Sequence, residues 1–326
     1  MRYLILGTGA LGSIFGGFLL KAGHRVAFLG RGPHFEHLRT RGLSIDGLFG
    51  EFTLGPVPVP GPHPDPYEVI LLCVKSFDTR SACESARGLL SPRGLIVSMQ
   101  NGLGNLEEIA RVFGERRTVG GRVIFGARLP EPGRATVTVY ADPVLLGALS
   151  PEADQELLRK VAADLDAAGI PTRVVPDILP PLWDKVLYNC ALNPLAAILG
   201  VPYGALAGHP DTREFMRRII EEIYAVAQAR GVALTRPEAE DYFRHFLTRL
   251  LPPTAAHRPS MWQDLQAGRP TEIEALNGAI CRYGGEMGLP TPYNEAVTRL
   301  IRFLERRGAG AAPFPPDGGP TPGPRA

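Results

Sequence analysis

The first thirty residues constrain the fold more than any other part of the chain. An apolar run at residues 3–6 ends at a glycine, a helical pattern follows over residues 10–22, and a second apolar run occupies residues 25–29. The turn between the first run and the helix has the spacing G-x-G-x-x-G. In this strand–turn–helix–strand context the spacing predicts a dinucleotide-binding α/β domain.

Each glycine of the turn has its own physical role. Gly7 permits the tight turn, Gly9 lets a pyrophosphate approach the backbone, and Gly12 lets the helix pack close to the strand. The helix N-terminus then offers unpaired N–H groups to the phosphates. A glycine-rich turn in an unrelated fold is the alternative. The predicted cofactor-binding segment consists of Gly7, Thr8, Gly9, Ala10, Leu11 and Gly12.

The end of the second predicted strand indicates which dinucleotide binds. Enzymes that use NAD usually carry an acidic residue there, which binds the ribose 2′-hydroxyl. This strand instead ends in Leu29-Gly30-Arg31, with no carboxylate. Because an arginine can pair with the 2′-phosphate, we expect NADPH as the cofactor and Arg31 as a ligand to it. A solvated surface charge is the alternative interpretation of Arg31.

Two more polar residues follow predicted parallel strands at their carboxyl ends, where ligands bind in such sheets. Lys75 follows the run at residues 69–74, and we expect it to bind the cofactor or to be a lysine whose charge simply reaches solvent. Asn101 follows the run at residues 95–98 and is expected at the nicotinamide or the substrate. An Asn-Gly turn is the alternative for Asn101.

The remaining pattern divides the chain. Helical segments such as 106–112 alternate with strands up to two further runs at 135–140 and 144–146, which we expect to pair with each other. Prolines then cluster at 176–181, and the later patterns are helical. We expect an α/β fold: a Rossmann-type doubly wound domain (1–176), an all-helical domain (177–307) and a disordered Gly/Pro-rich tail (308–326). The expected helices span 182–199, 211–230, 237–250, 261–267, 272–287 and 293–306.

Composition excludes several classes of protein. A net charge of +2 argues against nucleic-acid and membrane-surface binding. The uncharged segment 3–20 mimics a membrane span, but five glycines interrupt it. The four cysteines form no C-x-x-C pair and lie near no histidine at metal-ligand spacing, so we expect free thiols, no metal and a cytoplasmic location. The sequence leaves open whether the protein forms a homodimer.

One helical segment of the second domain carries an unusual polar stripe. Lys185, Asn189 and Asn193 follow each other at intervals of four residues, and apolar residues lie between them. Such a buried stripe is costly unless it faces a polar cavity. A lysine whose pKa is lowered by burial can donate a proton to a ketone oxygen, and the amides can hold substrate oxygens. The alternative is a stripe that faces solvent or the domain interface.

Two further segments resemble helix starts with capping boxes. Ser260 with Gln263, and Thr271 with Glu274, have the required spacing. Glu272 is then left at the first helical position, where its carboxylate is free to face a ligand. For Ser260 the alternative is simple capping, and for Glu272 a favourable charge at a helix N-terminus.

From Met1 to about Arg306 the chain resembles the ketopantoate reductases (2-dehydropantoate 2-reductases). Single motifs are weak, but together they are specific. The segments that carry the resemblance are Gly7-Thr-Gly-Ala-Leu-Gly12; Arg31-Gly32 with His34, Leu38 and Gly42-Leu43; Val74-Lys75 with Asp78-Thr79; Gln100-Asn-Gly-Leu-Gly-Asn105; Lys185 with Asn189, Asn193 and Pro194; Ser260-Met261 with Asp264; and Thr271-Glu272-Ile273.

The resemblance implies roles for these positions. It implies a 6-phosphogluconate-dehydrogenase-like arrangement and the NADPH-dependent reduction of 2-dehydropantoate to pantoate, in pantothenate and coenzyme A biosynthesis. Lys185 would be the general acid, and Glu272 would contact both the substrate and Lys185. The implied substrate-binding residues are Asn101, Asn189, Asn193 and Ser260, and the implied NADPH contacts include Arg31, Lys75 and Asn101.

Two other functions remain. The first is a reductase of another small 2-oxo acid, or an opine-type dehydrogenase, which would share the cofactor site and differ only in the pocket. The second is an NADP-binding sensor without catalysis. A sensor would have no reason to retain Lys185, Glu272 and Ser260 together.

Overall fold

The apolar segments of the N-terminal half form one mixed β-sheet. The structure, a computed structural model, describes residues 1–307, and in this range nine strands join in the order β2-β1-β5-β6-β7-β8-β3-β4, with β9 paired to β8. The first five strands of this order run parallel, as the doubly wound prediction requires. The strands are β1 (Arg2–Leu6), β2 (Arg25–Leu29), β3 (Leu43–Gly47), β4 (Phe52–Leu54), β5 (Tyr67–Leu72), β6 (Leu90–Ser98), β7 (Thr118–Glu131), β8 (Arg134–Ala148) and β9 (Thr172–Val174).

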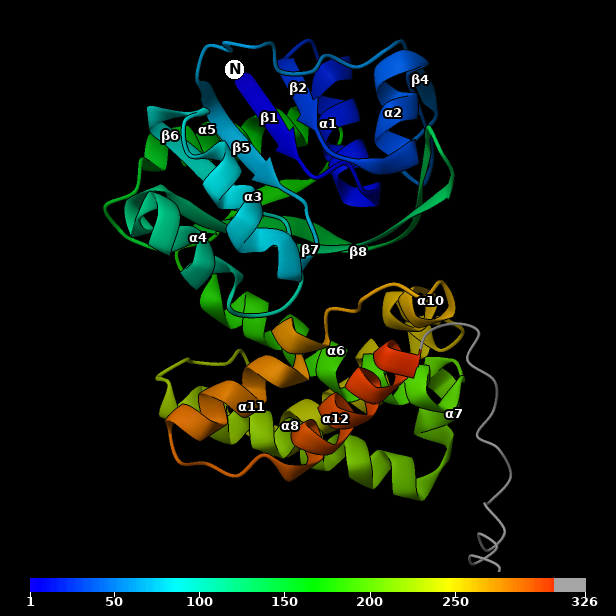
Figure 1. Cartoon of the computed structure of the whole chain (residues 1–326). Coiled ribbons are helices and arrows are strands. Elements are labelled where there is room, and N and C mark those ends of the chain that lie inside the picture. The colour runs from blue at the N-terminus through cyan, green and yellow to red at the C-terminus, as the bar shows by residue number, and fades with distance from the viewer. Residues whose placement is uncertain (308–326) are drawn as a thin grey trace, which may run out of the picture.

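Helices cover both faces of this sheet (Figure 1). Because side chains alternate along a strand, Ile5 packs on one face with Phe15, and Leu4 packs on the other with Leu106. Both faces are therefore apolar, as buried parallel strands require. The helices of this half are α1 (Ala10–Lys21), α2 (Gly32–Thr40), α3 (Thr79–Ala86), α4 (Asn105–Phe113) and α5 (Gln155–Ala167), with 3₁₀ turns at Ser76–Asp78 and Glu115–Arg117.

One strand prediction is wrong. Residues 135–140 and 144–146 do not pair with each other, because both belong to the long strand β8. Strand β7 pairs with β8 along its length, and its register shifts between Arg122 and Ile124, opposite the region of Pro143. A register shift lets a strand continue past a proline, which cannot donate a ladder hydrogen bond.

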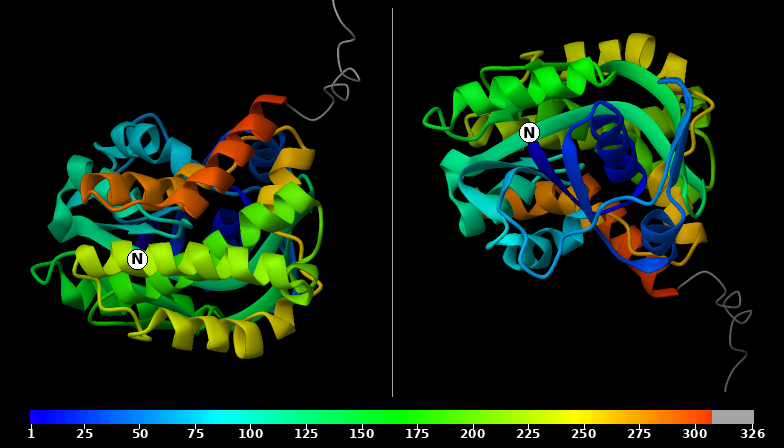
Figure 2. Two further views of the ribbon diagram at one scale, coloured as in Figure 1. Left: turned by 90° about the horizontal axis from the view of Figure 1, so that it is seen from below. Right: turned by 90° about the horizontal axis from the view of Figure 1, so that it is seen from above.

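The second half is helical and lies below the sheet domain in Figure 1, with α6 and α10 on the side that faces the sheet. Seen from below, α8, α11 and α12 lie in front of the sheet domain (Figure 2). The helices of this second half are α6 (Leu179–Leu199), α7 (Tyr203–Gly208), α8 (Pro210–Ala229), α9 (Ala239–His245), α10 (Ser260–Gln266), α11 (Asn277–Glu286) and α12 (Pro292–Arg307). It also contains a π-helical turn at Phe246–Leu250 and 3₁₀ turns at Pro252–Thr254 and Ile273–Ala275.

The helix expected at 272–287 is also corrected. It begins only at Asn277, after the 3₁₀ turn Ile273–Ala275. The carbonyl oxygen of Ala275 accepts a hydrogen bond from the N–H of Leu103, in the other domain, at 2.7 Å. A contact between the domains thus replaces a hydrogen bond within the helix.

Other expected helices shift by a few residues, and the one at 237–250 becomes α9 followed by the π-helical turn. The predicted tail, 308–326, lies outside the described residues. Within the described part of the chain, none of the helices combines the length and apolar character that crossing a membrane requires.

Candidate functional site

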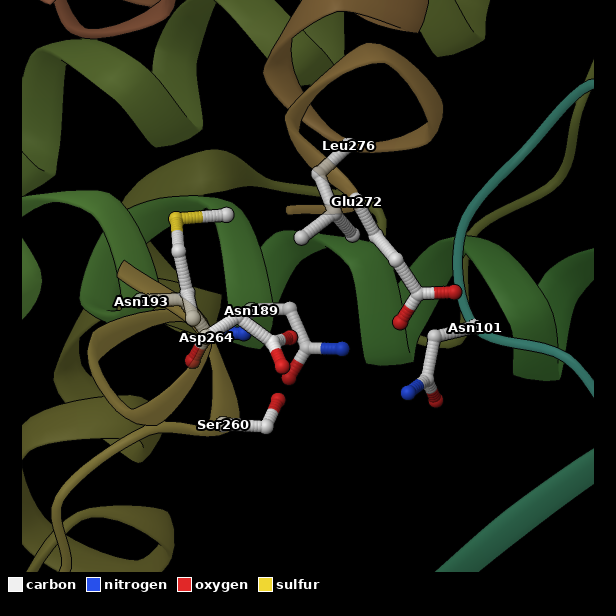
Figure 3. A pocket seen from close by; sticks show the side chains of 8 residues that line it. Asn101, Asn189, Asn193, Ser260, Asp264, Glu272 and Leu276 are labelled. Atoms are coloured by element: carbon white, nitrogen blue, oxygen red, sulfur yellow. The ribbon is translucent and has the colours of Figure 1, made fainter. Parts of the chain in front are cut away.

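A small pocket opens between the two domains (Figure 3). It has about 260 Å³ of empty space, part of it open to solvent, and six of its eight lining residues are polar. In Figure 3 the polar ends of Asn101, Asn189, Ser260 and Glu272 are directed toward the same space. The lining residues are Asn101, Asn189, Asn193, Ser260, Met261, Asp264, Glu272 and Leu276.

Lys185 reaches this region from α6. Its Nζ donates a hydrogen bond to Asn101 Oδ1 at 2.5 Å and another to the carbonyl oxygen of Val123 on β7. Both acceptors are uncharged. Burial lowers the pKa of Lys185 to about 8; the Glu272 carboxylate opposes this effect, and the Arg122 guanidinium adds to it.

The two asparagines of α6 continue the same stripe toward the C-terminal end of the helix. Asn193 is buried, and its Oδ1 accepts a hydrogen bond from the hydroxyl of Tyr203 at 2.5 Å. With Oδ1 engaged, the NH₂ group of Asn193 is left as a donor. Asn189 lies one turn earlier, nearer to Lys185, and is less buried. The structure therefore brings the predicted polar stripe to a polar pocket rather than to bulk solvent.

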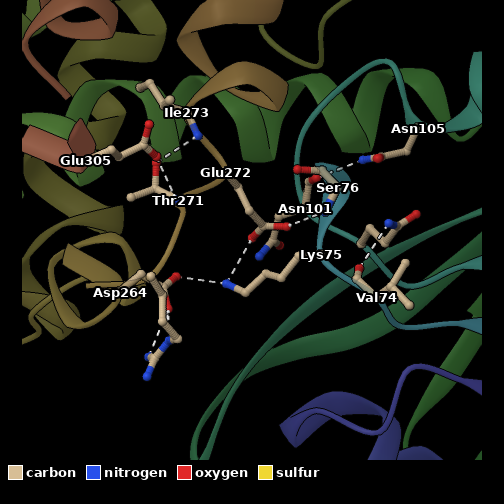
Figure 4. A network of polar contacts seen from close by, with 12 residues as sticks. Val74, Lys75, Ser76, Asn101, Asn105, Asp264, Thr271, Glu272, Ile273 and Glu305 are labelled. Atoms are coloured by element: carbon tan, nitrogen blue, oxygen red, sulfur yellow. Dashed lines mark hydrogen bonds and ion pairs between the residues drawn. The ribbon is translucent and has the colours of Figure 1, made fainter. Parts of the chain in front are cut away.

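Lys75 connects the two domains (Figure 4). Its Nζ donates to Asp264 Oδ2 at 2.9 Å and lies 3.6 Å from Glu272 Oε2. Burial alone would lower the pKa of Lys75, but the carboxylates of Glu272 and Asp264 outweigh burial and raise it. Lys75 is therefore a firmly charged bridge between the domains.

Glu272 meets the other domain a second time. Its Oε1 accepts a hydrogen bond from the backbone N–H of Ser76 at 3.2 Å. Glu272 is not the first residue of an α-helix, as the sequence predicted, but directly precedes the 3₁₀ turn. Its carboxylate is nevertheless directed into the pocket (Figure 3).

Both predicted capping boxes are wrong. Ser260 is itself the first residue of α10, which begins after Pro259 without a side-chain cap. Thr271 Oγ1 accepts from the N–H of Ile273 at 3.2 Å, but Glu274 pairs with Arg302 at 2.5 Å instead of closing the box. Ser260 therefore does not cap α10, and its hydroxyl lines the pocket.

The glycine turn fits a dinucleotide. Gly7 has a φ of +101°, and a Cβ there would lie 2.5 Å from the backbone nitrogen of Val74. A Cβ on Gly12 would lie 1.9 Å from the carbonyl oxygen of Gly7, so both positions require glycine. A Cβ on Gly9 would meet no atom within 4 Å, which leaves open space at the N-terminus of α1. That helix has no acidic residue in its first turn and no side-chain cap, so its N–H groups are available to phosphates.

Arg31 lies at the open end of β2, directly before α2. Its side chain is 82% exposed, and its guanidinium pairs with Asp78 at 2.6 Å. The ion pair holds Arg31 beside the loop that carries Lys75. Thr8 completes the glycine turn, and Ala10 and Leu11 begin α1.

Two contributors were assigned no role from the sequence. Asp264 is 5% exposed, lines the pocket and binds both Lys75 and Arg269. Its spacing of four residues from Ser260 places both on one face of α10, which was an available signal. The carbonyl of Val123 is a backbone atom, so no side-chain pattern could have indicated it.

The chain is similar to known proteins along most of its length. The family described as "Ketopantoate reductase PanE/ApbA" matches residues 3–151, and the one described as "Ketopantoate reductase PanE/ApbA C terminal" matches residues 177–305. A 2-dehydropantoate 2-reductase from Aquifex aeolicus is 38% identical over 307 residues, which are 94% of this chain and 97% of that protein. One from Pyrococcus horikoshii is 33% identical over 95% of this chain and 100% of that protein.

Solved structures show the same similarity. The crystal structure of a 2-dehydropantoate 2-reductase from Geobacter metallireducens has a TM-score of 0.84 and 30% identity, covering 93% of this chain and 99% of that one. A ternary complex of a D-mandelate dehydrogenase with NADH and anilino(oxo)acetate has a TM-score of 0.85 and 25% identity, covering 94% and 99%. The fold, the pocket and these matches together show that the chain belongs to the ketopantoate reductase family.

Proposed function

We propose that this oxidoreductase reduces 2-dehydropantoate to pantoate with NADPH, a step of pantothenate and coenzyme A biosynthesis. The observation that carries the proposal is the setting of Lys185. Its ammonium group is held by two uncharged oxygens beside a small polar pocket, and burial lowers its pKa to about 8. A ketone reduction needs such a proton donor next to the carbonyl oxygen.

The residues at the glycine turn would hold the cofactor. The N–H groups at the start of α1 would bind the pyrophosphate, and Arg31 would pair with the 2′-phosphate that distinguishes NADPH from NADH. The absence of a carboxylate at the end of β2 supports this choice. When bound, NADPH supplies the hydride that the carbonyl carbon receives.

Lys185 would donate the proton to the carbonyl oxygen. Asn101 Oδ1 and the carbonyl of Val123 fix the direction of its ammonium group, so that one N–H is free for the substrate carbonyl oxygen. Near pH 7 a group with a pKa of about 8 is mostly protonated and still acidic enough to give up its proton. Glu272 opposes the lowering of that pKa, so it helps to keep Lys185 charged before the reaction.

The other pocket residues would bind the acid. The Ser260 hydroxyl and the amide groups of Asn189 and Asn193 are neutral donors suited to the substrate's carboxylate and hydroxyl oxygens. The hydrogen bond from Tyr203 holds Asn193 with its NH₂ group free. Two cations, Lys75 and Arg269, offset the charges of the Asp264 and Glu272 carboxylates, which limits their repulsion of an anionic substrate.

Reduction of another 2-oxo acid is the second candidate. The similarity to a D-mandelate dehydrogenase in complex with NADH and anilino(oxo)acetate favours an aromatic 2-oxo acid. Only two of the eight pocket residues, Met261 and Leu276, are apolar, which favours a small hydroxylated acid instead.

Spectrophotometric assays of NADPH oxidation would decide between the candidates. The panel should contain 2-dehydropantoate, its analogue without the hydroxyl group, and benzoylformate. We expect the highest kcat/KM with 2-dehydropantoate. A higher kcat/KM with benzoylformate would replace the proposed substrate by an aromatic one, and no oxidation with any acid would favour a sensor.

We also propose that the protein acts in the cytoplasm and that its domains divide at residues 176 and 177. All four cysteines are free thiols, which suits a reducing compartment. Strand β9 ends at Val174 and α6 begins at Leu179, so the proposed division falls in the connection between them.

A further inference from the structure

His34 lies behind the glycine turn and joins three separate segments of the sheet domain. It belongs to the first turn of α2. Its Nε2 is 2.9 Å from Ser13 Oγ on α1. Its Nδ1 accepts a hydrogen bond from the backbone N–H of Gly133, in the turn between β7 and β8, at 3.0 Å.

These partners fix where the proton of the ring lies. A backbone N–H can only donate, so Nδ1 must be the unprotonated acceptor and Nε2 must carry the hydrogen. Nε2 therefore donates to Ser13 Oγ, and the hydroxyl hydrogen of Ser13 is left to face the carbonyl oxygen of Thr8, 3.5 Å away. Burial, together with the nearby His37, lowers the pKa of His34 to about 4, which agrees with a neutral ring.

The chain of contacts ends in the cofactor-binding segment. Ser13 is fully buried in the first turn of α1, and its backbone N–H donates to the carbonyl oxygen of Gly9 at 2.9 Å. Thr8, 6% exposed, lies within the glycine turn. On its other side His34 is three residues from Arg31, the residue directly before α2. One imidazole thus ties the segment expected to bind the pyrophosphate to the segment that carries Arg31.

We propose that His34 is a positioning residue for NADPH: through Ser13 it holds the start of α1 and the start of α2 at the spacing that the pyrophosphate and the 2′-phosphate require together. The proposal rests on the proposed use of NADPH. A residue that only stabilised the fold would affect the melting temperature without a selective change in cofactor affinity.

Two conservative substitutions separate the two hydrogen bonds of the ring. In His34→Gln the side-chain NH₂ group can reach the place of Nε2 and still donate to Ser13. In His34→Asn the side-chain oxygen can reach the place of Nδ1 and still accept from Gly133, while the bond to Ser13 is lost. His37→Ala is the matched control, because a Cβ on Gly133 would lie 2.2 Å from the ring of His37, so this histidine packs against the same turn.

Calorimetric titration of the full-length variants with NADPH, without substrate, measures the effect directly. We expect His34→Asn and Ser13→Ala each to raise the Kd about fivefold, since a typical hydrogen bond contributes about 1 kcal/mol. His34→Gln and His37→Ala should stay within about twofold of the wild type, and kcat at saturating NADPH should hardly change in any variant. The double variant Ser13→Ala/His34→Asn should be no worse than either single one, because both remove the same link.

An unchanged Kd in Ser13→Ala would overturn the proposal, and this variant removes only one buried oxygen, so it also serves if His34→Asn does not fold. Equal losses in His34→Gln and His34→Asn, or an equal loss in His37→Ala, would overturn it as well, since packing alone would explain them. If the wild type bound no NADPH, the proposed function itself would fail, and His34 would have no cofactor to position.

Discussion

Two lysines reach the same cleft from opposite domains, and their surroundings shift their pKa values in opposite directions. Lys75, from the sheet domain, touches the carboxylates of Asp264 and Glu272, which raise its pKa despite burial. Lys185, from the helical domain, donates to two neutral oxygens, and burial lowers its pKa to about 8. The charge of the hydrogen-bond partners therefore separates a permanent cation from a proton donor.

The comparison extends to the two walls of the cleft. The sheet domain offers backbone N–H groups and permanent cations, which suit phosphates. The helical domain offers neutral amides, a hydroxyl, two carboxylates that pair with Lys75, and one lysine that can release its proton, and these groups surround the reacting acid.

Replacement of Lys185 should have the largest effect. Lys185→Ala should lower kcat by about 10²–10⁴, the usual range for loss of a general acid. Lys185→Arg should not restore turnover, because guanidinium cannot give up its proton near neutral pH. Steady-state kinetics measures the loss, and NADPH titration should show unchanged binding. Near-normal turnover in Lys185→Arg would mean that only positive charge is needed here.

Replacement of Arg31 should act on the cofactor alone. Arg31→Ala should raise the KM for NADPH about tenfold, since a hydrogen bond to a charged group contributes roughly 1.5–3 kcal/mol and the exposure of Arg31 favours the lower end. The KM for NADH should hardly change. Arg80→Ala is the control, because this exposed arginine pairs with Glu84, four residues along the same helix. Equal effects on both cofactors would remove Arg31 from the 2′-phosphate.

Replacement of Lys75 tests the contrast between the lysines. Lys75→Gln keeps a polar side chain but removes the charge. Because we expect Lys75 to contact NADPH, the KM for NADPH should rise about fivefold. Asp264 keeps its second partner, Arg269, at 2.9 Å. The pH dependence of kcat should stay that of the wild type. A fall in kcat as large as that of Lys185→Ala would abolish the proposed division of roles.

Replacement of Ser260 should have the smallest effect. Because α10 begins without a side-chain cap, Ser260→Ala should not lower the melting temperature. The KM for the 2-oxo acid should rise about threefold through loss of one neutral hydrogen bond. A thermal melt beside a kinetic assay measures both. A lower melting temperature with an unchanged KM would assign Ser260 to the fold rather than to the substrate.

The sequence predicts best what is encoded locally. The glycine turn, α1 and the stripe on α6 depend on residues close together in the chain, and the structure contains all three. The joining of β3 to β8 depends on partners ninety residues apart, and no local pattern indicates it.

Contacts between the domains account for most of what was missed at the site. The bond from Leu103 to Ala275 delays the start of the expected helix to Asn277. The bond from Lys75 to Asp264 spans 189 positions. Each is determined by how the two domains meet, which local propensity cannot encode.

The pH dependence of kcat/KM tests the central claim most directly, because it reports the ionisation of groups in the free enzyme. The protonated form of Lys185 is the active one, so the rate should fall as the pH rises through about 8. In Glu272→Gln the fall should move to lower pH, because the carboxylate that raises the pKa of Lys185 is gone. A wild-type profile that stays flat between about pH 6 and pH 10 would contradict the assignment of Lys185 as the proton donor.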